Sequence, residues 1–254
     1  KTGGSRSHIF ADLNLELNQD NSYNSDLSLK IQRTSNDTYF RAHDINTALV
    51  DSENTNLENV INYNFSKDNM HLNISGALYE DLRANTNDRY EYILPNIMYG
   101  KTFLSEKSGS IDFKSNALYK NYDTNKHLTL LTNDLIWTSN NYITKGGIVN
   151  ALGGMITNKN YEAKNTSNHK TDKIVNEMKS VLTFKSSLPM KKENTRTSNI
   201  FSPNFMIRYA PGHMKNLRSD NVILKYENLF STNKTSDIEN GLSAILGFDF
   251  KKNE

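Results

Sequence analysis

Apolar and polar residues alternate along much of the chain. In the clearest segment, every second side chain from Ile9 to Leu17 is apolar, and Asp12, Asn14 and Glu16 lie between them. A strand with this period has one apolar face and one polar face. At least eight segments share the pattern, and no long helical period interrupts them. The chain is therefore predicted to form one large antiparallel sheet.

Turn-forming and polar segments divide this pattern into strands. Strands are predicted at residues 9–17, 27–32, 61–65, 70–74, 91–103, 110–120, 127–139, 142–159, 174–187, 199–209, 221–228 and 240–252. Long polar loops are predicted at 35–56, with a short helical turn near Tyr39, at 81–89 and at 160–173. The paired glycines at 146–147 and 153–154 lack the Lys-Ser/Thr pair of a phosphate-binding loop, so they are interpreted as bends in a curved sheet.

Strand and loop lengths favour a membrane barrel. Several predicted strands reach the roughly 9–11 residues with which a tilted strand crosses a bilayer. Short turns and longer polar loops alternate in places, and aromatic residues lie near strand ends. The fold class is predicted to be all-β: part of an antiparallel transmembrane β-barrel, with about ten to twelve strands of a larger barrel. A soluble β-sandwich or solenoid is the alternative, although sandwich strands usually have only about 5–6 residues.

The composition of the chain argues against several classes of function. The formal net charge of +2 is too small for a nucleic-acid footprint, so no nucleic-acid partner is expected. Cysteine is absent, which excludes a disulfide framework or a thiolate metal site within these residues. The six histidines follow no metal-binding spacing, and no Gly-x-Ser-x-Gly motif occurs. Neither a cofactor, a metal nor a catalytic residue is predicted.

Alternation also selects the polar wall of the predicted barrel. The candidate lumen-facing residues are Asp12, Asn14, Glu16, Lys30, Asn62, Asn73, Lys114, Arg208 and Lys225. Asp237 and Glu239 would share one face if they lay on a strand, in a binding or acid–base role, or they are solvated loop carboxylates. The charged residues of this wall include both signs. This suits a wet interior, the sugar and phosphate groups of an amphiphile, or a protein plug.

The most specific motifs lie in the last quarter of the chain. They are Ile200–Pro203, Arg208–Leu217 and Tyr226–Ser231, followed by Asn233 and a glycine-bearing strand. These segments resemble the LptD family of lipopolysaccharide-assembly proteins, also called organic solvent tolerance proteins. The residues that match the family's pattern in order are Pro203, Pro211, Gly212, Asn228, Leu229, Phe230, Ser231, Asn233, Asp237, Glu239 and Gly241.

The chain also departs from this pattern. Lys234 stands where the family usually has arginine, and Ile238 replaces a second arginine, so charge pairs made by those arginines are in question. Upstream, Ser7–Phe10, Ser35–Phe40 and Leu94–Pro95 resemble further family segments in the same order.

The resemblance implies a function that the alternation alone does not. It implies that residues 1–254 are an internal segment of one outer-membrane barrel domain, with a periplasmic domain before it, the closing strands after it, and the lateral gate outside it. The barrel would insert lipopolysaccharide into the outer leaflet of the outer membrane of a Gram-negative bacterium, with the plug lipoprotein LptE and the periplasmic bridge protein LptA as partners. No bond is broken in such a transfer, so no enzyme activity is expected. The strand pattern by itself equally allows a passive porin or a TonB-type receptor, and less readily a soluble secreted β-sheet adhesin.

Overall fold

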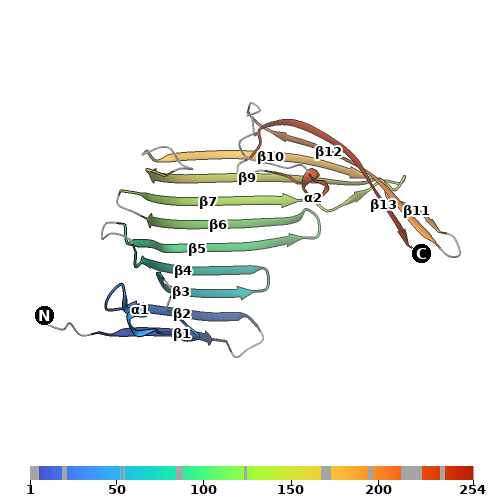
Figure 1. Ribbon diagram of the computed structural model, residues 1–254. Coiled ribbons are helices and arrows are strands. Elements are labelled where there is room, and N and C mark those ends of the chain that lie inside the picture. The colour runs from blue at the N-terminus through green and yellow to red at the C-terminus, as the bar shows by residue number, and fades with distance from the viewer. Residues whose placement is uncertain are drawn as a thin grey trace. The chain divides into compact units, whose positions relative to one another are not determined.

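The computed structural model describes residues 6–18, 22–51, 53, 55–83, 88–122, 125–166, 173–193, 197–212, 225–234 and 238–253. Strands dominate this part of the chain (Figure 1). They are β1 (His8–Glu16), β2 (Asn24–Thr34), β3 (Asn56–Lys67), β4 (Met70–Asp81), β5 (Tyr90–Ser105), β6 (Gly109–Tyr122), β7 (His127–Thr138), β8 (Tyr142–Ile143), β9 (Val149–Lys164), β10 (Val175–Ser187), β11 (Met190–Glu193), β12 (Ser198–Ala210) and β13 (Gly241–Asn253). Two short helices accompany them, α1 (Tyr39–His43) and α2 (Tyr226–Leu229).

The described strands form one 13-stranded sheet. The hydrogen-bonded order is β1-β2-β3-β4-β5-β6-β7-β9-β10-β12-β11, with β8 beside β9 and β13 beside β12. This order confirms the predicted all-β antiparallel fold, and the sheet is open, as expected for part of a barrel. The chain divides into two compact units, a first unit of residues 1–101, 114–133 and 159–176 and a second unit of residues 102–113, 134–158 and 177–254.

The register of the first unit produces alternating apolar and polar rows across β1 to β5. One row of directly paired residues is apolar: Leu15, Leu27, Tyr63, Ile74 and Ile97. The neighbouring row is polar throughout: Asn14, Ser28, Asn62, Ser75 and Asn96. Because directly paired residues point to the same face of a sheet, the alternation read along single strands becomes two continuous faces. One is apolar and one is polar.

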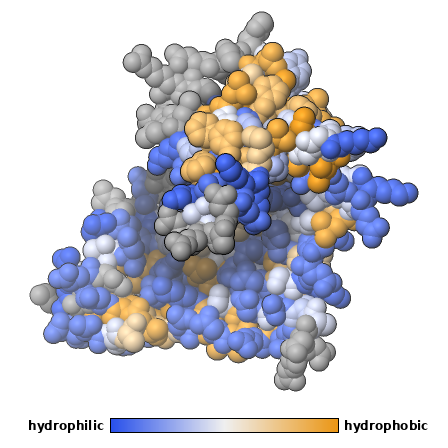
Figure 2. Space-filling model, turned by 90° about the vertical axis from the view of Figure 1, so that its right-hand side faces the viewer, coloured by the Kyte–Doolittle hydropathy of each residue, from blue (hydrophilic) through white to orange (hydrophobic). Residues whose placement is uncertain are grey.

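The apolar face of the first unit is not covered by a second layer of the described residues. Leu13 is 44% exposed, Ile61 is 50% exposed and Leu94 is 49% exposed, although all three are apolar. Apolar side chains also lie on the surface in the space-filling view (Figure 2). A contiguous exposed apolar surface of this kind marks an interaction site, a membrane contact or an aggregation hazard.

The second unit repeats the two-faced arrangement in β10, β12 and β13. Along β12 and β13, Phe201 pairs with Phe250, Phe205 with Leu246, and Tyr209 with Leu242. Leu246 is 79% exposed. The intervening residues Asn204, Met206 and Arg208 belong to the other face, where Met206 and Arg208 are buried.

A loop with its own small core follows β2 in the first unit. Phe40, Val50, Leu57 and Leu82 form a buried cluster, against which Phe10 packs. Helix α1 lies in this loop, as predicted for the segment near Tyr39. The loop is thereby fixed to residues from the ends of β1, β3 and β4 rather than left as a simple linker.

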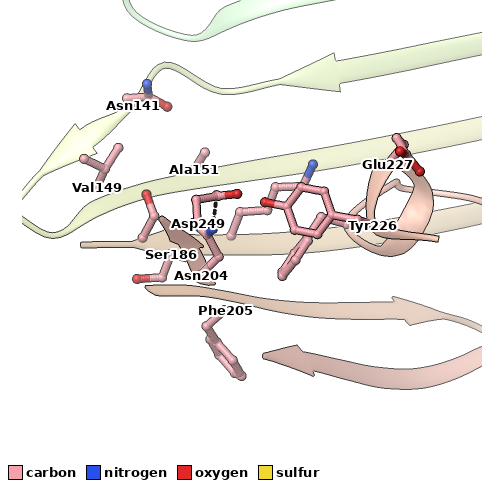
Figure 3. Close-up of a pocket in the computed structure, with 12 residues that line it drawn as sticks. Asn141, Val149, Ala151, Ser186, Asn204, Phe205, Tyr226, Glu227 and Asp249 are labelled. Carbon is pink, nitrogen blue, oxygen red and sulfur yellow. Dashed lines mark hydrogen bonds between the residues drawn. The ribbon is translucent and has the colours of Figure 1, made fainter. Parts of the chain in front are cut away.

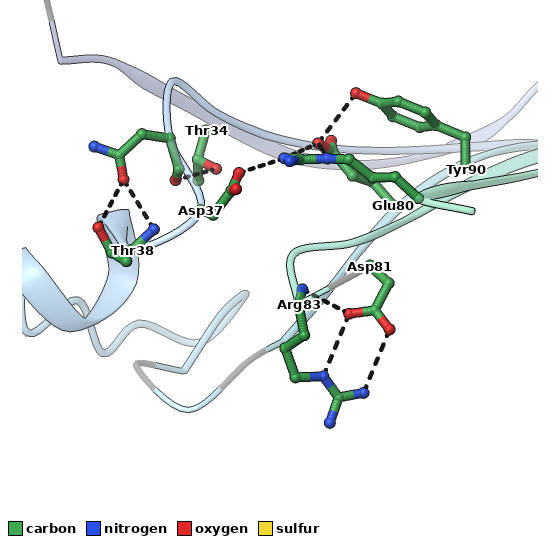
Figure 4. Close-up of polar contacts among 9 residues, drawn as sticks. Thr34, Asp37, Thr38, Glu80, Asp81, Arg83 and Tyr90 are labelled. Atoms are coloured by element: carbon green, nitrogen blue, oxygen red, sulfur yellow. Dashed lines mark hydrogen bonds and ion pairs between the residues drawn. The ribbon is translucent and has the colours of Figure 1, made fainter. Parts of the chain in front are cut away.

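An ion-pair network holds the same loop to the β4–β5 connection. Arg89 binds Glu80 at 2.5 Å and Asp37 at 2.5 Å, and the Tyr90 hydroxyl donates to Glu80 at 3.2 Å (Figure 4). The hydrogen bond that Arg89 donates to Asp37, followed by the bond that it donates to Glu80, raises the pKa of Arg89 above its ordinary value, against the effect of burial. The guanidinium therefore keeps its charge throughout the physiological range.

Replacing Arg89 by methionine is expected to loosen the 35–55 loop. The change removes the charge-assisted hydrogen bonds to Glu80 and Asp37 but keeps an apolar side chain. Without solvent screening, each of these bonds contributes about 1.5–3 kcal/mol to stability. We expect protease cleavage within 35–55 to become several-fold faster in limited proteolysis. Arg83→Met is the matched control, because the Arg83–Asp81 pair is exposed and worth about 0–1 kcal/mol. Equal cleavage of both variants would contradict this role.

Some predicted boundaries and elements are wrong. Residues 160–164, expected in a loop, belong to β9, and the short strand β11 was not predicted. The region 142–159 is not one strand, because a turn at 144–148 with Gly147 at φ +81° separates β8 from β9. The predicted strand 221–228 is also wrong where it is described: residues 226–229 are α2, and residues 221–224 lie outside the described residues. Neither described helix is long and apolar enough to span a membrane.

The β5–β6 turn depends on a glycine. Gly109 has φ +87°, and a Cβ at this position would lie 2.0 Å from the carbonyl oxygen of Thr138. Gly109→Ala is therefore expected to reduce the free energy of unfolding by about 2–3 kcal/mol, from left-handed backbone strain plus the clash. Gly146→Ala is the control, because the nearest atom to a Cβ there is 3.9 Å away. Urea unfolding of the full-length protein measures both, and equal midpoints would contradict the prediction.

Candidate functional site

A hydrogen-bonded ladder crosses the polar face of the first unit. The Asn73 side-chain amide donates to Asn62 at 2.6 Å and to Asn64 at 2.6 Å. Asn64 in turn donates to Asp26 at 2.9 Å. These side chains come from β2, β3 and β4, and the strand register aligns them. The predicted lumen-facing residues Asn62 and Asn73 thus bond to each other directly.

A charged row crosses the same polar face. Lys30 forms an ion pair with Glu58 at 2.5 Å, and Lys120 forms one with Glu91 at 2.5 Å. Glu58 pairs with Tyr79 in the register, and Tyr79 pairs with Glu91. The row therefore runs from β2 to β6 with lysines at its ends and carboxylates inside. Alternation predicted Lys30 but missed Glu58, Glu91 and Lys120, because only the register shows that they are neighbours.

The remaining predicted residues of the first unit lie on their expected strands. Asp12 pairs with Lys30 in the register, Asn14 donates to Asp12 at 3.4 Å, and Glu16 pairs with Asp26. All three β1 residues are exposed. Lys114 lies on β6, six residues before Lys120 and in the same alternation. Whether these side chains face a barrel lumen remains a prediction.

The second unit holds a buried arginine on its polar face, near the end of β12. Arg208 is 2% exposed. Its Nε donates to the carbonyl oxygen of Thr232 at 2.5 Å, and an Nη donates to the side chain of Asn233 at 3.3 Å. The register places Thr183 and Ser243 on either side of Arg208. Arg208 therefore fastens residues 232–233 onto β12.

The Asn-Leu-Phe-Ser element forms a helical turn, not a strand. The Asn228 side chain accepts a hydrogen bond from the Lys225 backbone N–H at 2.9 Å, and Ser231 Oγ donates to the Asn228 carbonyl at 2.7 Å. The Phe230 ring lies against Gly247 of β13, where an added Cβ would be 3.1 Å away. Lys225 precedes α2, so its assignment by strand alternation was wrong. Local Asn and Ser side-chain bonds compete with strand formation here.

The structure explains how the chain accommodates its two departures from the family pattern, Lys234 and Ile238. Lys234 lies 3.8 Å from Glu239, and both side chains are largely buried, so a cation at 234 still pairs with a carboxylate. Ile238 packs with Val181 and Ala210 in a buried apolar cluster. An isoleucine at this position packs in the cluster without bringing the charge that an arginine would place there.

The other motif residues surround this segment. Glu239 is not on a strand, and its backbone N–H donates to Asn233 at 3.1 Å. Asp237 lies outside the described residues, so the paired face of 237 and 239 is not tested. Gly212 has φ +111° and approaches Asn240, and Gly241, at φ +109°, opens β13. Pro203 lies on β12 opposite Phe248, and Pro211 follows that strand.

The site offers binding groups rather than a reaction centre. Among the described residues, no group of three or more His, Asp or Glu side chains could hold a metal ion. The polar faces present amides, hydroxyls and ion pairs suited to hydrogen bonding with a polar ligand. That the protein is not an enzyme and needs no cofactor stays a prediction.

Comparison with known proteins identifies the family. The model of the LptD family, described as LPS transport system D, matches residues 4–243. No curated protein matches the chain. The match covers most of the sequence, including much of each unit and the Arg208-anchored segment, and it confirms the resemblance seen in the motifs. The chain belongs to the LptD family of lipopolysaccharide transport proteins.

Proposed function

We propose that this chain forms part of an outer-membrane barrel that transports lipopolysaccharide and inserts it into the outer leaflet. The observation that carries the proposal is the two-faced sheet in a member of this family. Its apolar face is exposed in both units, and its opposite face carries hydrogen-bonded amides and ion pairs. Lipid solvates the apolar face, and water or a polar headgroup solvates the opposite face.

The amphiphilic cargo explains why both faces are needed. Lipopolysaccharide has a polar, anionic sugar portion and apolar acyl chains. A polar lumen wall lets the sugar portion pass without losing its hydrogen bonds, whereas the acyl chains belong in the bilayer. Because transfer breaks no covalent bond, binding and guidance suffice.

Two protein partners belong to the proposal. A plug lipoprotein, LptE, would occupy the lumen against the polar wall, and the periplasmic bridge protein LptA would deliver the lipid. The mixed-sign row from Lys30 to Lys120 supports a protein plug, since a plug surface with both charge signs can match it. A passive porin or receptor barrel has no comparable support, because the family match is to lipopolysaccharide transport.

Depletion of the full-length protein in its source bacterium tests the proposal. We expect lipopolysaccharide to disappear from the cell surface and accumulate inside, as measured by surface labelling with an impermeant reagent followed by fractionation. The protein itself should fractionate with the outer membrane. Unchanged surface lipopolysaccharide together with a loss of small-solute uptake would instead favour a porin or receptor.

A further inference from the structure

A pocket of about 480 Å³ lies beside α2 in the second unit (Figure 3). Strands β9, β10, β12 and β13 contribute to its lining, together with Tyr226, Glu227 and Phe230 from α2 and its end. Figure 3 shows Tyr226 pointing from α2 toward Asn204 and Asp249, whereas Phe205 points away. The pocket is of the size that holds a small molecule or one segment of a larger one.

The strand register explains why polar groups converge there. Asn204 lies opposite Ser187 on one side and Gly247 on the other. Its amide nitrogen donates to Asp249 at 2.6 Å. This bond leaves the second carboxylate oxygen of Asp249 and the amide oxygen of Asn204 as acceptors for a ligand. Gly247 has no side chain, so Phe230 can lie close to the sheet beside them.

Donors and an aromatic ring complete the pocket. Lys185 lines it and makes no hydrogen bond or ion pair with any residue that the structure describes. Its ammonium group therefore has donors available for a ligand. Tyr226 is 56% exposed, so its ring is accessible to a ligand. Its ring offers a flat apolar surface next to the polar groups.

The charge of the pocket decides between ligand classes. Among the lining residues that the structure describes, Lys185 is the one cation, and Glu227 and Asp249 are both anions, so this part of the lining carries excess negative charge. A phosphate or carboxylate ligand would be repelled. An acyl chain would leave the amide, carboxylate and ammonium groups desolvated without partners. A neutral sugar ring fits better, because its hydroxyls both donate and accept and its C–H face can pack on an aromatic ring.

We propose that this pocket binds a neutral sugar ring, with Tyr226 packing on the ring and Asp249, Asn204 and Lys185 bonding its hydroxyls. The proposal rests on the proposed function, because the transported lipopolysaccharide would supply the sugar. It assigns the pocket to uncharged sugars of that chain rather than to its phosphates or acyl chains.

Ligand-observed saturation-transfer NMR with the full-length protein tests the assignment, in a detergent without a sugar headgroup. The probes are maltotriose, glucose 6-phosphate and decanoate. We expect maltotriose to bind with a millimolar dissociation constant, glucose 6-phosphate to bind more weakly, and decanoate not to compete. Tyr226→Ala should weaken maltotriose binding about tenfold, Tyr226→Phe should retain it, and Tyr209→Ala, on the opposite face, should leave it unchanged.

Any one of four results would overturn the proposal. They are the absence of saturable maltotriose binding, competition by decanoate, tighter binding of glucose 6-phosphate than of maltotriose, and maltotriose binding that Tyr226→Ala leaves intact. If Tyr226→Ala lowers the urea midpoint, Lys185→Gln replaces it, since Lys185 is exposed and makes no bond whose loss would unfold the protein. Failure of the proposed function is seen separately: surface lipopolysaccharide would then persist on depletion, even if maltotriose binds.

Discussion

Replacing Arg208 by alanine is expected to release residues 225–234 from the sheet and to destabilise the protein by about 2–4 kcal/mol. The guanidinium is buried and bonds Thr232 and Asn233, so its removal leaves the Thr232 carbonyl unsatisfied and a cavity beside Met206. Urea unfolding of the full-length protein measures the loss, and hydrogen exchange of residues 225–234 reports the release.

Two controls separate this anchor from a general effect of charge removal. Arg208→Lys keeps the charge but cannot bond both Thr232 and Asn233 with a planar group, so we expect it to recover only part of the stability. Arg33→Ala removes an exposed arginine from β2 and should change the free energy of unfolding by less than about 0.5 kcal/mol. An Arg208→Ala protein with native stability and unchanged exchange in 225–234 would show that the segment is held by other contacts.

Introducing lysine on the apolar face should have an effect of similar size. Ile61→Lys places a charge at a position that is 50% exposed yet surrounded by the apolar row partners Leu29 and Gly76. If this face contacts lipid, the cost is about 2–4 kcal/mol near the bilayer centre. Reversible folding into lipid vesicles, followed by urea titration, measures it.

The neighbouring residue provides the matched control. Asn62 lies at the same depth on the opposite, polar face, and Asn62→Lys removes one hydrogen bond from Asn73. We expect a cost of about 1 kcal/mol or less. Equal costs at 61 and 62 would contradict the assignment of the two faces.

Much of the fold could be predicted from single-strand patterns. Alternation is strong in the middle of β1 to β4, where one face is apolar, and each of these strands overlaps its predicted range. The strands β3 and β4 extend well beyond the predicted ranges 61–65 and 70–74, because polar residues such as Asn59 and Glu80 interrupt the apolar face there. Residues 160–164 of β9 were missed because polar Asn160 and Glu162 flank Tyr161, and this polar composition is typical of a loop. Single-strand patterns do not determine which strands pair, so the ion-pair residues Glu58, Glu91 and Lys120 could not be predicted.

The Asn-Leu-Phe-Ser element shows a different limit. Residues 221–228, which lead into it, were predicted as a strand in which Leu224 and Tyr226 alternate with Lys225. Asn228 and Ser231 instead bond the local backbone and close a turn. Arg208 was predicted as a polar-face residue, and the structure shows the bonds it makes to this turn. The sequence contained the residues of the anchor, whereas their contact depends on a connection between β12 and β13 that no alternation pattern describes.

Placing single cysteines at Ile61 and Asn62 tests the central claim most directly, because these 254 residues contain no other cysteine. Each variant of the full-length protein, with any cysteine elsewhere replaced, is spin-labelled in lipid vesicles and exposed to oxygen, which concentrates in the bilayer, and to a water-soluble nickel chelate. We predict that the label at 61 responds mainly to oxygen and the label at 62 mainly to the chelate. Strong chelate access at both positions would contradict a membrane wall with its apolar face in lipid.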